Sequence, residues 1–244
     1  MNALNTFLFA IFPYLCLAVF LMGSLARYDR DQYTWKSDSS MLLRKDGMRL
    51  ASNLFHAGIL FLFVGHLFGL LTPQWAYAWL ISPESKKVVA NVSGGIAGAA
   101  CFVGLTILLY RRMFDARIRL TSHRTDLAIL IILWVQLALG LSTLLLARYP
   151  AAEVGEMLAL SKYLQSIVVF QPNVELLAGV SLVSKLHMLL GMLIFLLFPF
   201  SRLVHVWSGL ATLAYVFRPY QLVRSRRMNV PAGQNQPGRA PTAP

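Results

Sequence analysis

Residues 51–73 read ASNLFHAGILFLFVGHLFGLLTP and contain no Asp, Glu, Lys or Arg. A helix needs about 20 mostly apolar residues to cross the hydrocarbon core of a bilayer, and this segment supplies them. Thr72-Pro73 should end the helix, because proline has no backbone N–H and disfavours a helical conformation in the residue before it. The segment therefore predicts a membrane-spanning helix, and that helix carries two histidines, His56 and His66.

The composition of the whole chain agrees with a membrane protein. Of its 244 residues, 57% are hydrophobic and only 13% are charged, whereas soluble domains are about 25% charged. The formal net charge is +12, which in a soluble protein would suggest binding to nucleic acid. Here the basic residues lie between apolar runs, so they indicate orientation in a lipid membrane and no nucleic-acid partner.

Windows without charged residues set the number of spans. They cover residues 1–26, 50–83, 88–110, 127–147 and 186–201, and the last continues to Phe217 with only Arg202 inside it. Each can supply a membrane crossing. Backbone polar groups in lipid must be satisfied internally, and no alternating barrel strands are present. The predicted fold is all-α, an integral membrane bundle of five transmembrane helices.

The positions of Lys and Arg predict the orientation of this bundle. They concentrate in the first connection (27–49), in the third (111–124) and after Phe217. The positive-inside rule then places the N-terminus outside and the C-terminus in the cytoplasm. The outer connection 148–185 is expected to hold a helix on the membrane surface between Glu153 and Phe170.

The chain is expected to form one membrane domain over residues 1–227. Residues 228–244 are rich in Pro, Gly, Gln and Ala, and they predict a disordered cytoplasmic tail.

Four of the five histidines lie in predicted spans, where ionisable side chains usually mark a function. The second helix runs outward and the fifth runs inward, so His56 and His205 lie toward the cytoplasm while His66 and His187 lie toward the outside. Two opposed pairs at two depths suit the axial ligands of two six-coordinate hemes. The chain has no CxxCH motif, so these would be non-covalent b-type hemes.

The spacing of the histidines strains this interpretation. At about 1.5 Å per residue, His56 and His66 are separated by roughly 15 Å, and His187 and His205 by roughly 27 Å. Pro199 is expected to kink the fifth helix and shorten its projection along the membrane normal.

Other interpretations of the histidines remain open at this point. A zinc site would need a compact four-ligand cluster, which two distant pairs do not provide. A transporter with an intramembrane histidine relay would also place histidines in spans, but without heme. His123 lies in the basic third connection, where we expect a solvated loop residue.

Several further residues have both a structural and a functional interpretation. Gly65 and Gly69 flank His66 and could serve helix packing or leave room for a flat ring. Arg112 and Arg202 could snorkel to the membrane surface or pair with heme propionates. Lys86 could anchor the third helix at the headgroups or hydrogen-bond a quinone carbonyl.

Long motifs add a resemblance to these observations. The chain closely resembles the gamma (cytochrome b) subunit of membrane-bound respiratory nitrate reductase over about residues 1–227. The resemblance is carried by the segment at 51–73 together with RYDRDQYTW at 27–35, LHMLLGMLIFLLFPFSRLVHVW at 186–207 and PYQLVRSRR at 219–227.

The resemblance implies a di-heme, quinol-oxidising subunit in the cell inner (cytoplasmic) membrane. The ligands of the family's outer heme match His66 and His187, and those of its inner heme match His56 and His205. The family's quinol site matches Gly65, His66 and Lys86, and its donor is a menaquinol or a ubiquinol.

The resemblance also implies partners. Electrons would pass from the inner heme to an iron–sulfur beta subunit, and a molybdenum-containing alpha subunit would reduce nitrate. The chain itself would hold no nitrate-reducing centre. An alternative with the same hemes is the cytochrome b anchor of a formate dehydrogenase or hydrogenase.

Overall fold

The structure is a computed structural model that describes residues 3–31, 35, 43, 46–146 and 150–208. Nearly all of these residues are helical, and no β-strand occurs among them. Within these described ranges, five helices are long and apolar enough to cross a membrane, so the predicted all-α fold with five spans is confirmed. The expected tail at 228–244 lies outside the described residues.

The spans follow the order of the charge-free windows in the sequence. The first combines α1 (Ala3–Thr6), a π-helical turn η1 (Phe7–Ile11) and α2 (Phe12–Arg30). The other four contain α3 (Met48–Leu71), α5 (Pro83–Phe114), α7 (Arg124–Leu146) and α9 (Leu182–Leu197). The connections hold the shorter elements α4 (Gln74–Tyr77), α6 (Ala116–Thr121), α8 (Pro150–Val168) and η4 (Val174–Leu177).

The third span begins earlier than its charge-free window. The charge-free window covers residues 88–110, but α5 starts at Pro83. The Ser82 hydroxyl accepts a hydrogen bond from the backbone N–H of Ser85 at 3.2 Å, and proline suits the first helical position. Lys86 therefore lies in the first turns of α5 rather than in a loop.

The fifth span is broken rather than kinked. Helix α9 ends at Leu197, and two 3₁₀ turns follow, η5 (Phe198–Phe200) and η6 (Arg202–Val204). Ser201 between them is extended, with φ −117° and ψ 175°. The prediction of a helix running on through Pro199 was wrong here, because proline cannot donate to the helical ladder and its ring obstructs the preceding turn.

Helix α2 supports this break. The Arg27 guanidinium donates to the backbone carbonyls of Pro199 at 2.7 Å and Ser201 at 2.9 Å. Both carbonyls lie where the helix is interrupted, and backbone polar groups at membrane depth need donors. A Cβ on Gly23 would lie 2.7 Å from the Pro199 side chain, so only a glycine lets α2 come this close.

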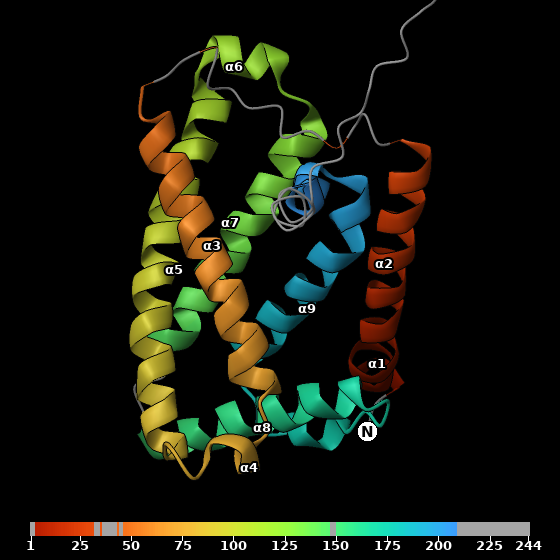
Figure 1. Cartoon of the computed structure of the whole chain (residues 1–244), viewed down its shortest axis with the longest axis vertical. Coiled ribbons are helices and arrows are strands. Elements are labelled where there is room, and N and C mark those ends of the chain that lie inside the picture. The colour runs from red at the N-terminus through yellow and green to blue at the C-terminus, as the bar shows by residue number, and fades with distance from the viewer. Residues whose placement is uncertain (1–2, 32–34, 36–42, 44–45, 147–149, 209–244) are drawn as a thin grey trace, which may run out of the picture. The chain divides into compact units, whose positions relative to one another are not determined.

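The helices pack in the order α3, α5, α7, α9, α2, with the N-terminal span beside α9 (Figure 1). Helices α3 and α9 are not among the described pairs that pack extensively. Helix α8 lies across one end of the spans (Figure 1).

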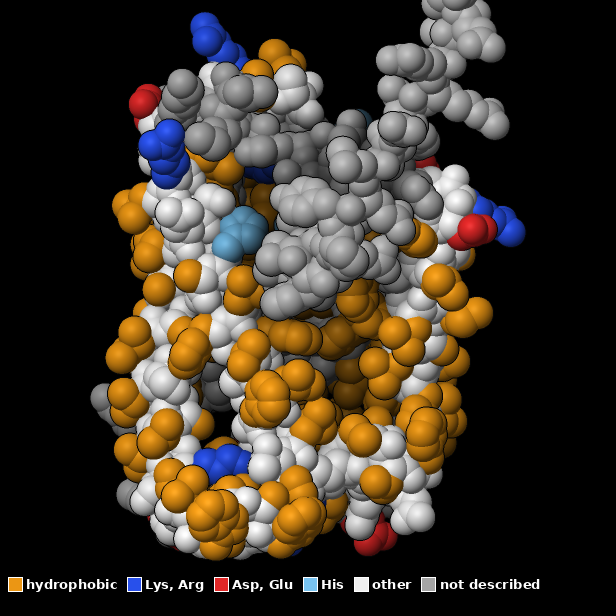
Figure 2. Space-filling view, in the orientation of Figure 1, with side chains coloured by type: hydrophobic (Ala, Val, Ile, Leu, Met, Phe, Trp, Pro, Cys, Tyr) orange, Lys and Arg blue, Asp and Glu red, His pale blue; other side chains and the backbone are white. Residues whose placement is uncertain are grey.

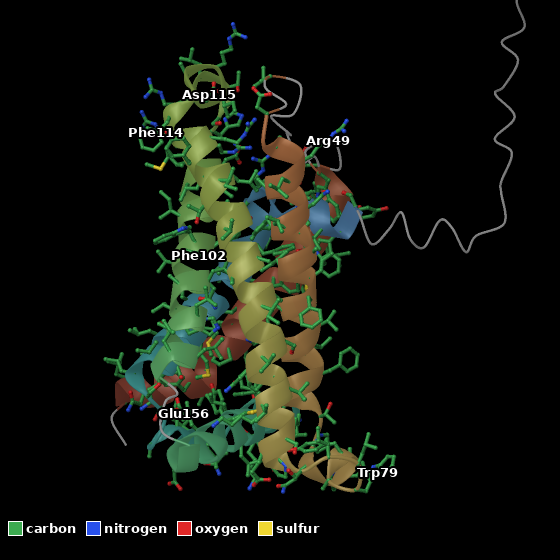
Figure 3. The ribbon with its side chains drawn as sticks, turned by 90° about the vertical axis from the view of Figure 1, so that its left-hand side faces the viewer. Arg49, Trp79, Phe102, Phe114, Asp115 and Glu156 are labelled. Atoms are coloured by element: carbon green, nitrogen blue, oxygen red, sulfur yellow. The ribbon has the colours of Figure 1, made fainter. Side chains whose placement is uncertain are left out.

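The two ends of the helices collect different connections. Arg49, Phe114 and Asp115 lie at one end, here called the Asp115 end, while Trp79 and Glu156 lie at the opposite one, the Trp79 end (Figure 3). The first and third connections, which carry half of the Lys and Arg residues, therefore share an end. Which end faces the cytoplasm stays a prediction.

The lateral surface of the helices is apolar. Hydrophobic side chains cover most of the height of the visible face, and charged side chains gather toward the two ends (Figure 2). Large side chains such as Phe61, Phe68 and Ile96 are more than half exposed. Exposed apolar area on this scale is expected where lipid is the solvent.

Helix α8 closes the Trp79 end by satisfying carbonyls of the spans. The Ser161 hydroxyl and the Gln165 amide donate to the carbonyl of Leu70 at 2.5 and 3.0 Å, near the end of α3. The fully buried Tyr163 donates its hydroxyl to the carbonyl of Phe9 in the π-helical turn at 2.7 Å. Burial raises the pKa of the Tyr163 hydroxyl, so the group stays a donor at neutral pH.

Glycines set the close contact between α3 and α5. A Cβ on Gly104 would lie 2.6 Å from the Phe55 backbone nitrogen and 2.7 Å from the Ala51 carbonyl oxygen. One on Gly58 would lie 2.6 Å from Cys101 Cβ. Small residues on both helices thus let the two backbones meet, as is common for helices in membranes.

We predict that Gly104→Ala destabilises the protein by about 1–3 kcal/mol, because the added methyl group overpacks against backbone atoms. The measurement is thermal unfolding in detergent. Gly94→Ala on the same helix is the matched control, since its Cβ would meet no atom within 4 Å. Equal stability of the two variants would contradict the packing described here.

Candidate functional site

The structure brings the four span histidines together in two pairs. The ring centroids of His56 and His205 are 6.3 Å apart with planes at 74°. Those of His66 and His187 are 6.2 Å apart with planes at 41°. These are the pairs that the antiparallel topology predicted.

Each pair is assembled from helices that do not pack extensively on each other. Helix α3 is held by α5, and α9 is held by α7 and α2. His56 and His66 project from α3, while His187 lies on α9 and His205 follows η6. Both histidines of α3 are exposed in the protein alone, so the imidazoles approach each other across a space between helices.

One ring nitrogen of each histidine is already hydrogen-bonded to a backbone carbonyl. The Nδ1 atoms lie 2.6–3.1 Å from oxygens of Ser52, Leu62, Gln136 and Arg202, for His56, His66, His187 and His205 respectively. Because a carbonyl only accepts, each Nδ1 is the donor in these bonds. Nε2 is then the ring atom through which each histidine could bind a metal, and this is how metal-ligating histidines are usually oriented. The Nε2 of His187 also lies 3.5 Å from the side-chain Nε2 of Gln136.

The spacing of the paired rings fits a metal ion between them. A metal bound by an imidazole nitrogen on each side, with bonds of about 2.0–2.1 Å, separates the two ring centroids by about 6–6.5 Å. The two observed separations, 6.3 and 6.2 Å, fall in this interval. The residues present thus fit two hexacoordinate hemes, one at each pair.

Glycines beside the pair His66–His187 leave space. A Cβ added to Gly65 or Gly69 would meet no atom within 4 Å, so neither glycine serves helix packing within the described residues. Figure 2 shows the face beside α3 hollowed. The role predicted for these glycines, to leave room for a flat ring, agrees with this space and stays a prediction.

Two arginines meet one buried carboxylate at the Asp115 end. Asp126 in the first turn of α7 lies 3.3 Å from the Arg112 guanidinium and 3.4 Å from that of Arg202. The Asp126 side chain is about nine-tenths buried. Arg202 also lies next to the His205 ring, because the His205 Nδ1 bonds the carbonyl of Arg202. Guanidinium groups suit a propionate, but the predicted contact of Arg112 and Arg202 with propionates stays a prediction.

Lys86 rests on an aromatic ring at the Trp79 end. Its Nζ lies 3.7 Å from the centroid of the Tyr77 ring, a cation–π contact with α4. Lys86 is only partly buried, so Tyr77 limits the positions of its ammonium group. Among the described residues, this contact with Tyr77 does not decide between anchoring and quinol binding.

Three residues that contact predicted site residues were not identified from the sequence: Asp126, Tyr77 and Gln136. Gln136 is the one amide side chain in the window 127–147, and a polar side chain at membrane depth is a usable signal. Asp126 lies just before that window, and nothing in the sequence pairs it with residues 14 and 76 positions away.

The zinc alternative gains no support from the described residues. They contain no group of three or more His, Cys, Asp or Glu side chains placed to hold a metal ion. His123 is exposed between α6 and α7, as expected for a loop residue.

Comparison with known proteins identifies close relatives. The sequence profile of the family described as nitrate reductase gamma subunit matches residues 5–226. The respiratory nitrate reductase 2 gamma chain of Escherichia coli (strain K12) is 51% identical over 226 residues, covering 92% of this chain and 98% of that protein. The respiratory nitrate reductase 1 gamma chain of the same organism is 48% identical, covering 93% and 100%. The nitrate reductase gamma chain of Bacillus subtilis (strain 168) is 38% identical, covering 90% and 97%.

We predict that Asp126→Asn destabilises the protein by about 3 kcal/mol or more, because it leaves two largely buried guanidinium groups without their shared anion. Thermal unfolding in detergent measures the effect. Asp29→Asn, at an exposed position on α2, is the control. If both variants unfold at the same temperature, the Asp126 cluster does not stabilise the Asp115 end.

Proposed function

Since this chain belongs to the nitrate reductase gamma subunit family, we propose that it oxidises quinol and carries the electrons across the membrane through two b-type hemes. The family match gives it the role of a nitrate reductase subunit. Five apolar helices agree with a membrane protein. We assign it to the cell inner membrane, with the Asp115 end in the cytoplasm.

The observation that carries this proposal is the geometry of the two histidine pairs. The ring separations of 6.3 and 6.2 Å suit axial ligands, and every Nδ1 is already engaged by a carbonyl. His56 and His205 would hold the inner heme, and His66 and His187 the outer one. When bound, the hemes supply two one-electron carriers at different depths.

At the outer side, the quinol would bind near Gly65, His66 and Lys86. It loses two electrons and two protons to become quinone, and the protons leave on the outer side. Lys86 Nζ, steered by the Tyr77 ring at 3.7 Å, can hydrogen-bond a quinol oxygen and stabilise its deprotonated form. Gly65 leaves the space that the ring requires.

At the inner side, Arg112 and Arg202 would bind propionates while Asp126 holds both guanidinium groups in place. The electron acceptor would be an iron–sulfur beta subunit, and nitrate would be reduced in a molybdenum-containing alpha subunit. Moving one charge against 100 mV costs roughly 2.3 kcal/mol. Inward electron transfer with outward proton release therefore contributes to the membrane potential.

Two alternatives predict different results. An anchor of a formate dehydrogenase or hydrogenase is not the family that the comparisons identify. A histidine-relay transporter would contain no heme, and a reduced-minus-oxidised spectrum of the purified protein without b-type bands would favour it over the present proposal.

We predict that the purified complex holds two b-type hemes in this chain, and that His66→Ala or His187→Ala loses the outer one and stops quinol oxidation. A pentacoordinate iron without its second imidazole is held more weakly. Heme content and spectral redox titration measure the loss. His123→Ala is the control, because that residue is exposed in a connection. Retention of two normal hemes in either pair variant would refute the pairing.

We predict that Lys86→Ala weakens binding of a quinol analogue roughly 10- to 100-fold while both hemes remain, since a charged hydrogen bond contributes about 1.5–3 kcal/mol. Titration of the outer heme spectrum with the analogue gives the affinity. Lys87→Ala, one residue along the same helix, is the control. An unchanged affinity would return Lys86 to an anchoring role at the headgroups.

A further inference from the structure

Gln136 on α7 and His187 on α9 are joined by two reciprocal hydrogen bonds. The Gln136 side-chain Nε2 donates to the backbone carbonyl of His187 at 3.1 Å. In return, His187 Nδ1 lies 3.1 Å from the backbone carbonyl of Gln136. Each side chain thus donates to the other residue's main chain, across two helices that pack along each other.

Two glycines make these carbonyls accessible. In a helix, a side chain covers the turn on its N-terminal side, so the residue four positions later shields a given carbonyl. Four residues after Gln136 comes Gly140, and four residues after His187 comes Gly191. A Cβ on Gly140 would lie 3.0 Å from His187 Cε1, and one on Gly191 would lie 3.3 Å from Gln136 Nε2.

His187 differs in this respect from the other three paired histidines. His56, His66 and His205 bond carbonyls three or four residues earlier in their own segments. Among the four, only the Nδ1 of His187 bonds a carbonyl of another helix within the described residues. The orientation of its ring therefore depends on the contact between α7 and α9.

The free-energy cost of burying the Gln136 amide indicates that this side chain has a role beyond packing. Its Oε1 is buried and accepts no hydrogen bond within the described residues. An unsatisfied buried acceptor costs about 1–3 kcal/mol. A leucine of similar size would avoid this cost, so packing alone does not explain a glutamine here.

We propose that Gln136 is a positioning residue for the outer heme ligand. Gly191 lets the Gln136 amide reach the carbonyl of His187, and Gly140 lets the His187 ring reach the carbonyl of Gln136. This inference rests on the proposed function. Donation from Nδ1–H to a carbonyl raises the basicity of the imidazole and favours the oxidised metal. The two bonds also fix the plane of the His187 ring, which stands at 41° to that of His66.

The test uses the whole complex with Gln136→Leu, Gly140→Ala and, as the control, Gly94→Ala on α5. Each heme is followed by its redox midpoint and by the electron paramagnetic resonance signal of its oxidised form. Gln136→Leu should shift the signal of the outer heme. Gly140→Ala should raise the midpoint of the outer heme or cause its loss, because the added methyl group pushes His187 away from the Gln136 carbonyl. The inner heme should not change in either variant, and the control should match the unsubstituted complex.

Gln136→Leu decides whether Gln136 positions the outer heme ligand. An unchanged paramagnetic resonance signal of the outer heme in this variant overturns the proposal. An equal shift of both heme signals, or loss of both hemes, also overturns it, because either result would indicate a general packing role. The proposed function fails separately: if the unsubstituted complex lacks two b-type hemes, the ligand assignments themselves are wrong.

Discussion

The arrangement of the site depends on one constraint, that the segment from His187 to His205 must match the shorter spacing of His56 and His66 on α3. A continuous helix would separate His187 and His205 by roughly 27 Å, against roughly 15 Å on α3. Pro199 ends α9, and the chain continues through two 3₁₀ turns with an extended Ser201 between them. The break would be untenable in lipid without donors for its carbonyls, and Arg27 provides them. The RYDRDQYTW motif thus begins with a residue that supports a segment 172 positions away.

A second organising feature is the use of glycine for backbone access rather than for flexibility. At Gly58 and Gly104 the missing side chain lets two helices meet. At Gly140 the same absence lets an imidazole reach a helical carbonyl. At Gly65 and Gly69 no atom of the described residues would meet an added Cβ within 4 Å. Glycine thus serves helix packing, orientation of an imidazole ring and open space, and the three-dimensional surroundings of each glycine decide which.

The sequence predicted the spans, the ends that share basic connections and the partners within each histidine pair. These follow from hydropathy and from the alternation of antiparallel helices, which are properties of whole segments. It did not predict that α5 begins at Pro83, because charged residues in the first turns of this helix interrupt the apolar window. Nor did it predict the Asp126 cluster or the contact of Gln136 with His187. Both join residues far apart in the chain through single side-chain atoms, and hydrophobic periodicity carries no information about such contacts.

The open side of the bundle has a consequence for how the protein matures. Helix α3 is fixed along α5, but it has no extensive packing against α9. On the proposed function, the two hemes would bind between α3 and α9 and link them. A ligand that binds only the folded, linked form stabilises that form by mass action. Chains made while heme is scarce would keep this side open to lipid and to membrane proteases. The supply of cofactor would then determine how many copies of the protein persist, before any electron is transferred.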